Sequence, residues 1–143
     1  IHDDYIAARR ADGSLNPADL SHQDWPYLDQ GFRNSSRAQA DHIDVKLRSI
    51  HCRRVFSAVP DKKVSALTPE EVEMLAEMEH ARWCAERFLA GWTNGSPKDK
   101  VRKISPDLVP WVDLPEPIRE YDRQAVRRLP EHLALVGEEI ERL

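Results

Sequence analysis

The feature that most constrains the fold is a helix-start signal at Thr68. Its hydroxyl can cap a helix, Pro69 suits the first helical position, and Glu71 stands at the third. The pattern predicts a helix that runs to about Ala90, where Gly91 can end it. Apolar residues cover roughly half of its circumference: Val72, Leu75, Ala76, Met78, Trp83, Ala85, Leu89 and Ala90. We therefore expect one long helix that packs this face into a core.

The remaining segments are expected to be mostly helical. Residues 2–10 and 117–128 are compatible with helices, and a last helix is expected from Pro130 to Leu143. Another helix is indicated by residues that share one face: Ser36, Ala40, Ile43, Leu47 and Ile50. The opposite face carries charges: Arg37, Asp41, Asp44, Lys46 and Arg48. Residues 91–117 form a proline-rich connection, and its interleaved apolar residues predict that it wraps over the core.

The run at residues 60–63, Pro-Asp-Lys-Lys, is the best linker candidate. We therefore predict a helical N-terminal extension or connector at residues 1–63 and a domain at residues 64–143. The 143 residues suit one domain, or a domain with an extension. The expected fold class is mainly α, a small helical module whose long proline-rich loop wraps the core. Because the chain begins at Ile1 without Met, we expect it to be part of a longer protein.

Composition excludes several classes of protein. The net charge is −4, from 21 Lys and Arg against 25 Asp and Glu, which argues against a nucleic-acid binder held by phosphate contacts. No apolar run approaches the ~20 residues of a membrane span, so no membrane insertion is expected. Two cysteines cannot build a disulfide framework, and a reducing, cytoplasmic location is expected.

Catalytic and metal-binding signatures are weak. There is no glycine-rich phosphate loop, nucleophile elbow or zinc-protease motif. Glu79 and Glu86 could form an acid pair, but they lie about 10.5 Å apart along a helix. Structural carboxylates that pair with Arg82, or with an arginine from another helix, are the favoured alternative. His80 and Cys84 could touch one metal ion, but further ligands are lacking, so neither a metal site nor a cofactor is expected.

A stripe of His80, Trp83 and Arg87 follows one edge of the apolar face. An indole with a guanidinium one turn away can stack a base and bind a phosphate or ribose. The alternative is a core tryptophan beside a solvated arginine. The loop at 98–103 adds four basic residues, which could contact an anion or form a solvated turn.

These residues carry a resemblance to the ryanodine receptor repeat (RyR) domain over about residues 67–136. The matching motifs are Leu75-Ala76-Glu77-Met78-Glu79-His80-Ala81-Arg82-Trp83, Gly91-Trp92, Pro106-Asp107-Leu108-Val109-Pro110-Trp111, Leu114-Pro115 and Tyr121-Asp122. The resemblance implies a mainly helical module without catalytic machinery. In bacteria such domains look like sensors or adaptors for nucleotide-type ligands, often joined to a Rossmann-like NAD-binding domain. We expect a bacterial-type member at the C-terminal part of a larger protein.

The resemblance also implies a ligand-facing set. It comprises Trp83, Arg87, Ser105 and Asp122, and we add His80 from the stripe and Lys103 from the basic loop. Many members have an aromatic residue where Asn94 stands and histidine where Ser105 stands, which changes the shape and hydrogen bonding of the site. Asp122 repels phosphate and suits a ribose hydroxyl or a base amine. Trp92 and Trp111 are expected to clamp the loop onto the core.

Three functions remain as hypotheses. The first is a binding module for a nucleotide-type small molecule. The second is an interaction or scaffold domain that docks a fused domain or a second copy of itself. The third is a small nucleotide hydrolase that uses Glu79 or His80.

Overall fold

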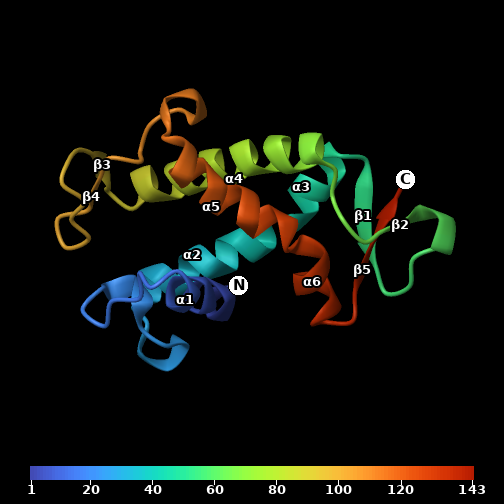
Figure 1. Cartoon of the computed structure of the whole chain (residues 1–143), viewed down its shortest axis with the longest axis horizontal. Coiled ribbons are helices and arrows are strands. Elements are labelled where there is room, and N and C mark those ends of the chain that lie inside the picture. Colours follow the sequence, from blue (N-terminus) through green and yellow to red (C-terminus); the bar gives the residue numbers. More distant parts are fainter. The chain divides into compact units, whose positions relative to one another are not determined.

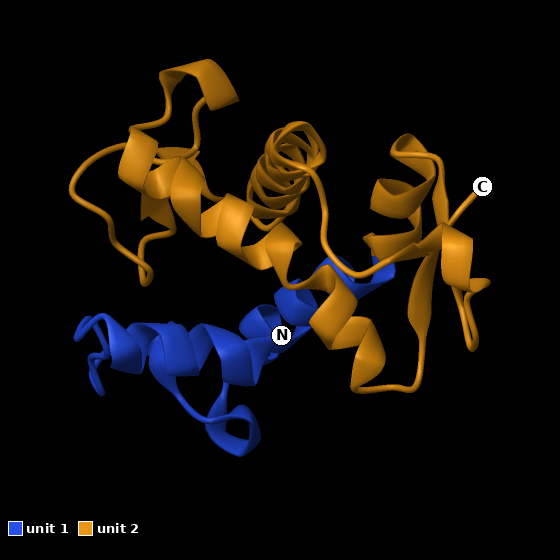
Figure 2. Ribbon diagram, turned by 45° about the vertical axis from the view of Figure 1, so that its right-hand side comes forward, with its two compact units in different colours: residues 1–41 blue, residues 42–143 orange.

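The computed structural model describes residues 1–143, which form two compact units at residues 1–41 and 42–143 (Figure 2). Unit 1 contains helix α1 (His2–Ala11), short 3₁₀ turns at Leu20–His22 and Trp25–Tyr27, and helix α2 (Gln30–Asp41). The helix predicted at residues 2–10 is confirmed. No helix of the chain combines the length and apolarity needed to cross a membrane.

In unit 1 a series of hydrogen bonds links the loop after α1 to that helix, and the partners of His22 determine which ring nitrogen carries its proton. The backbone N–H of Asn16 donates to His22 Nδ1 at 2.9 Å, so Nε2 carries the ring proton of a neutral imidazole. His22 Nε2 lies 3.0 Å from the Tyr5 hydroxyl, which in turn lies 3.0 Å from Ser21 Oγ. These bonds hold the loop that follows α1 against that helix.

Unit 2 contains the remaining elements (Figure 1). In chain order they are α3 (Ile43–Ser49), β1 (Cys52–Val55), β2 (Lys63–Val64), α4 (Pro69–Leu89), β3 (Thr93–Asn94), β4 (Ile104–Ser105), α5 (Glu116–Arg127), α6 (Leu129–Ala134) and β5 (Glu139–Arg142). Short 3₁₀ turns lie at Pro60–Lys62 and Trp111–Asp113. Helices α4 and α5 pack along one another (Figure 1).

The expectation of a mainly α fold is wrong, because the chain contains two sheets and is mixed α/β. An antiparallel sheet has the strand order β1-β5-β2, and β3 pairs with β4 in parallel. Residues 139–142 form the central strand of the first sheet instead of the end of a helix. Ile140 pairs with Arg54 on one side and Val64 on the other, and it is buried. Pairing on both edges outweighs the helix propensity of this Glu-rich segment.

The single helix predicted from the stripe at residues 36–50 is divided. Helix α2 ends at Asp41, and α3 begins at Ile43 as part of the other compact unit. The apolar residues Leu47 and Ile50 enter the core of unit 2. A periodic pattern constrains which side of a helix is apolar but not whether the helix continues, so the break was not visible in the spacing.

Helix α4 is confirmed in its bounds and its cap, but the expected packing of its whole apolar face is wrong at the C-terminal end, where Ala85, Leu89 and Ala90 are exposed. Thr68 Oγ1 accepts the backbone N–H of Glu71 at 3.2 Å, and Glu71 Oε2 accepts the backbone N–H of Thr68 at 3.0 Å, which completes the capping box. Glu71 also pairs with Arg142 of β5 at 2.5 Å. The start of α4 is therefore linked to the central strand of the antiparallel sheet.

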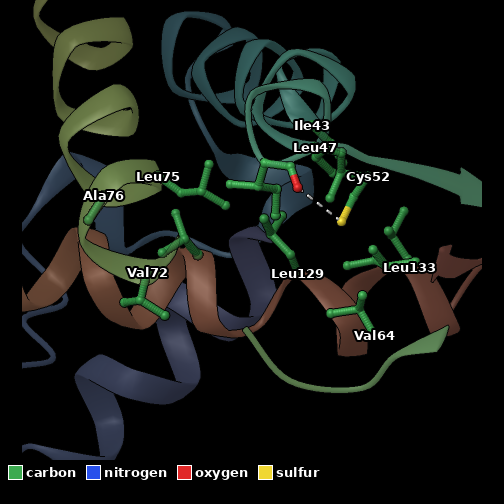
Figure 3. Close-up of a cluster of buried hydrophobic side chains, with 12 residues drawn as sticks. Ile43, Leu47, Cys52, Val64, Val72, Leu75, Ala76, Leu129 and Leu133 are labelled. Atoms are coloured by element: carbon green, nitrogen blue, oxygen red, sulfur yellow. Dashed lines mark hydrogen bonds between the residues drawn. The ribbon is translucent and has the colours of Figure 1, made fainter. Parts of the chain in front are cut away.

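The core of unit 2 gathers side chains from α3, the antiparallel sheet, α4, α5 and α6 (Figure 3). Its members are Ile43, Leu47, Ile50, Cys52, Val64, Val72, Leu75, Ala76, Val126, Leu129, Leu133 and Ile140. They come from both sides of the predicted boundary between residues 63 and 64. The division into an extension and a domain stays a prediction about organisation, but the packing of residues 42–63 belongs with unit 2.

Candidate functional site

A row of aromatic and cationic side chains follows helix α4. His80 stacks on Trp83 with ring centres 5.9 Å apart and an interplanar angle of 25°. The guanidinium of Arg87 lies 5.6 Å from the Trp83 ring centre and 5.0 Å from that of Trp92. Residues three and four apart on a helix are neighbours, so the predicted stripe becomes a continuous stack.

The stack extends to a third tryptophan at its other end. Trp111 lies 6.0 Å from His80, and the guanidinium groups of Arg119 and Arg123 lie 5.5 and 5.7 Å from its ring centre. Trp111 packs against the core from a partly buried position. Trp92 is only 7% exposed, in line with the expected clamp. We call the row Trp111, His80, Trp83, Arg87 and Trp92 the α4 stack.

His80 is held in one tautomer by its partners. Its Nε2 lies 2.7 Å from the carbonyl oxygen of Val109, and because a carbonyl only accepts, Nε2 carries the proton. Nδ1 then lies 3.7 Å from Asp122 Oδ2 on α5. Cys84 Sγ lies 3.3 Å from Nε2, and burial raises the pKa of its thiol, so the thiolate that metal binding or nucleophilic attack requires is disfavoured.

Asp122 is the most perturbed carboxyl group of the site. Burial raises its pKa from 3.8 to about 7, and the negative charge of Glu79 adds to the shift. Arg82 and Lys46 partly offset it, while Asp107 adds a smaller increase. At neutral pH this side chain can therefore either donate or accept a hydrogen bond.

A buried ion network is centred on Glu79, on the same helix as His80, Trp83 and Arg87. Glu79 is 4% exposed and accepts bonds from Lys46 Nζ at 2.6 Å and from Arg82 at 2.7 Å. Arg82 also bonds Glu86 at 2.6 Å. The predicted partnership of Glu79 with Arg82 is confirmed, whereas Lys46 was assigned to a charged face and is in fact 1% exposed. The only sequence signal for the burial of Lys46 is its position next to Leu47, at the edge of the apolar face.

Lys103 and Ser105 lie on the loop beyond the end of α4. Lys103 adopts a positive φ of 57° and donates from Nζ to the carbonyl oxygen of Ala90 at 2.8 Å, where a cation also suits the helix dipole. Ser105 is fully buried, and its Oγ accepts the backbone N–H of Asp107 at 3.2 Å. In this conformation the Ser105 hydroxyl is used inside the protein.

The structure thus joins four of the six candidate residues by direct contact: His80, Trp83, Arg87 and Asp122. Lys103 donates to the carbonyl oxygen of Ala90 at the end of the same helix, and Ser105 lies two residues after Lys103, in β4. The contact of Trp92 with Arg87 is not evident from the sequence, which predicts only that Trp92 clamps the loop onto the core. No group of three or more His, Cys, Asp or Glu side chains is arranged to hold a metal ion.

A separate cavity of about 540 Å³ lies at the other end of α4. It is bounded by the residues before the helix, by α5 and by the start of α6, with Leu67 and Val72 among its apolar residues and Arg123 and Arg127 among its charged ones. None of the six candidate residues lines it.

The chain matches a model of a known protein family. The model of the RyR domain family matches residues 61–142. The match covers more than half of the chain and includes α4, the loop that follows it, α5, α6 and β5.

Proposed function

Because the chain belongs to the RyR domain family, we propose that it is a non-catalytic module that binds a nucleotide-type small molecule at Trp83 and Arg87. The observation that carries this proposal is the pairing of the Trp83 indole with the Arg87 guanidinium at 5.6 Å. An aromatic face can stack a base, and a guanidinium can bind phosphate through two parallel hydrogen bonds. Lys103 supplies a second cation near the end of the same helix.

Asp122, His80 and Ser105 complete the proposed site. A carboxyl group with a pKa of about 7 suits a ribose hydroxyl or a base amine, because it can adapt its proton to the partner. His80 connects this carboxyl to Trp83. Ser105 can contribute its hydroxyl only after the loop shifts, since that hydroxyl is buried.

The ion pairs of Glu79 support a non-catalytic role for this carboxylate. Glu79 is engaged by Lys46 and Arg82, and the Nε2 of His80 is used by a backbone carbonyl. A general base needs a free lone pair within reach of the proton it removes. The partners of Glu79 therefore argue against a hydrolase that depends on Glu79 as its general base.

Isothermal titration calorimetry with mono-, di- and cyclic nucleotides tests the proposal. We expect at least one of them to bind, and Trp83→Ala to weaken that binding about tenfold or more, as loss of one stacking contact does. Phe56→Ala is the matched control, because Phe56 is an exposed aromatic residue outside the site. No binding by any nucleotide, or equal affinity in Trp83→Ala, would refute the proposal.

An interaction domain is the second candidate function. Leu89 is 91% exposed, and its neighbour Phe88 is also exposed, at the C-terminal end of α4. Such an apolar pair suits contact with a second copy of this chain or with a fused domain. Light scattering tests this candidate: a strict monomer whose state is unchanged in Leu89→Asp argues against self-association.

We also propose that the chain is a bacterial-type member located toward the C-terminus of a longer cytoplasmic protein. The family resemblance supports a Rossmann-like NAD-binding domain as the fused partner. Both cysteines, Cys52 and Cys84, are free thiols, as suits a reducing compartment. Sequencing the parent gene tests the source, the position of the chain and the fused domain, and cell fractionation tests the location.

A further inference from the structure

We infer that Arg87 occupies the slot between Trp83 and Trp92, and that a ligand's phosphate must draw it out before a base can stack on Trp83. The site thereby selects phosphorylated nucleotides over nucleosides, and Trp92 becomes a second wall of the ligand slot. This inference rests on the proposed function and adds to it a ligand class and a gating residue.

The chain turn after α4 builds the slot. Gly91 has a positive φ of 86°, a conformation that favours glycine, and it sends the chain back over the helix. The backbone N–H of Trp92 then bonds the carbonyl oxygen of Arg87 at 2.9 Å. As a result, one guanidinium lies within cation–π range of both indoles, and the Arg87 side chain is only 12% exposed.

The other neighbour of Trp83 is His80, which has a backbone partner. His80, one turn earlier on α4, stacks on the indole and bonds Val109 at 2.7 Å. The pair between Arg87 and Glu86 is longer, at 3.5 Å, and Glu86 already binds Arg82 at 2.6 Å. Of the two neighbours, Arg87 carries the permanent charge that a ligand's phosphate can bind outside the stack, so we take Arg87 as the residue that a stacking base displaces.

Because a stacking base must displace the Arg87 guanidinium, the charge of the ligand determines its affinity. Moving the guanidinium out gives up contacts with two aromatic rings, and an uncharged nucleoside regains only base stacking. A nucleotide offers its phosphate to the displaced guanidinium and regains a charge-assisted, bidentate interaction. We therefore expect the whole chain to bind a nucleotide at least about tenfold more tightly than the matching nucleoside.

The test compares four ribonucleoside 5′-monophosphates with their four nucleosides by calorimetry. Arg87→Ala empties the slot, so it should weaken nucleotide binding and strengthen nucleoside binding until the two affinities converge. Arg87→Met refills the slot without charge, so it should weaken nucleotide binding without improving nucleoside binding. Arg54→Ala is the control, because it removes the same charge from an exposed residue of β1, paired with Asp44 and outside the proposed site.

Circular dichroism melting of each variant ensures that folded proteins are compared. If nucleotides bind but Arg87→Ala leaves nucleoside affinity unchanged or lower, the gating inference is overturned while the proposed function stands. Equal affinity of the wild-type chain for nucleosides and nucleotides also overturns the gating inference and leaves the proposed function standing. If no compound binds any of the proteins, the proposed function fails and the inference fails with it.

Discussion

Asp122 shows at the scale of one residue how position changes chemistry. In the sequence it is one of many carboxylates in an acidic chain. Packing places it beside His80 and above the Glu79 network, where burial raises its pKa to about 7. The sequence places Arg87 beside Trp83 alone, and in the fold the guanidinium lies against a second indole, that of Trp92.

Replacing Asp122 tests the pKa shift. Between about pH 4 and pH 7 the folded chain retains a proton that the unfolded chain has lost, so this group's contribution to stability falls as pH rises through that window. Asp122→Asn removes the cost of burying the ionised form. We expect the variant to gain on the order of 2–4 kcal/mol over the wild type at pH 8, with little difference at pH 4.

Urea unfolding at both pH values measures this difference. Asp113→Asn is the control, because it makes the same charge change at an exposed position. An advantage of Asp122→Asn that is equal at pH 4 and pH 8 contradicts the shifted pKa.

At the scale of elements, helix α4 is specified by its own sequence, whereas strand β5 is specified by the strands that pair with it. Helix α4 carries its own start signal and apolar face, so its bounds were predicted closely. Strand β5 is specified by its partners β1 and β2, which come from a distant part of the chain. Helix α3 is joined to α4 by the buried pair of Lys46 and Glu79, a contact between residues 33 apart.

Lys46→Met tests the role of this pair in joining the two helices. The change removes one of two cations on a buried carboxylate, and we expect it to reduce the free energy of unfolding by about 2–4 kcal/mol. Arg54→Met is the control, because Arg54 pairs with Asp44 in an exposed position and should cost less than about 1 kcal/mol. Urea unfolding measures both changes, and similar losses in the two variants would show that burial adds nothing.

At the scale of the whole molecule, unit 2 contains a complete core of its own. All members of the core lie between Ile43 and Ile140, inside residues 42–143. The linker signal at residues 60–63 marks a 3₁₀ turn and the start of β2, and it falls between elements of the same packed unit. A boundary predicted from a polar, proline-containing run identifies a surface segment, but it does not show where the residues of one core begin and end.

Two truncated chains test where the folding unit begins. We expect residues 42–143 to fold alone with a cooperative melting transition, because they retain the whole core. Residues 64–143 lack α3 and β1, so they lose Leu47 and Cys52 from the core and should melt without a cooperative transition. Circular dichroism melting and amide NMR spectra report both results. A folded, cooperative 64–143 chain would move the boundary to the linker.

The sequence by itself determined helix α4, its cap, the α5 segment and the alignment of His80, Trp83 and Arg87, because these depend on spacing within a few helical turns. Only the tertiary structure decided the mixed α/β class, the division at residue 42, the burial of Lys46 and the contact of Trp92 with Arg87. Each of those depends on groups brought together from distant positions or across a chain turn. Their geometry is set by packing, which local periodicity does not encode.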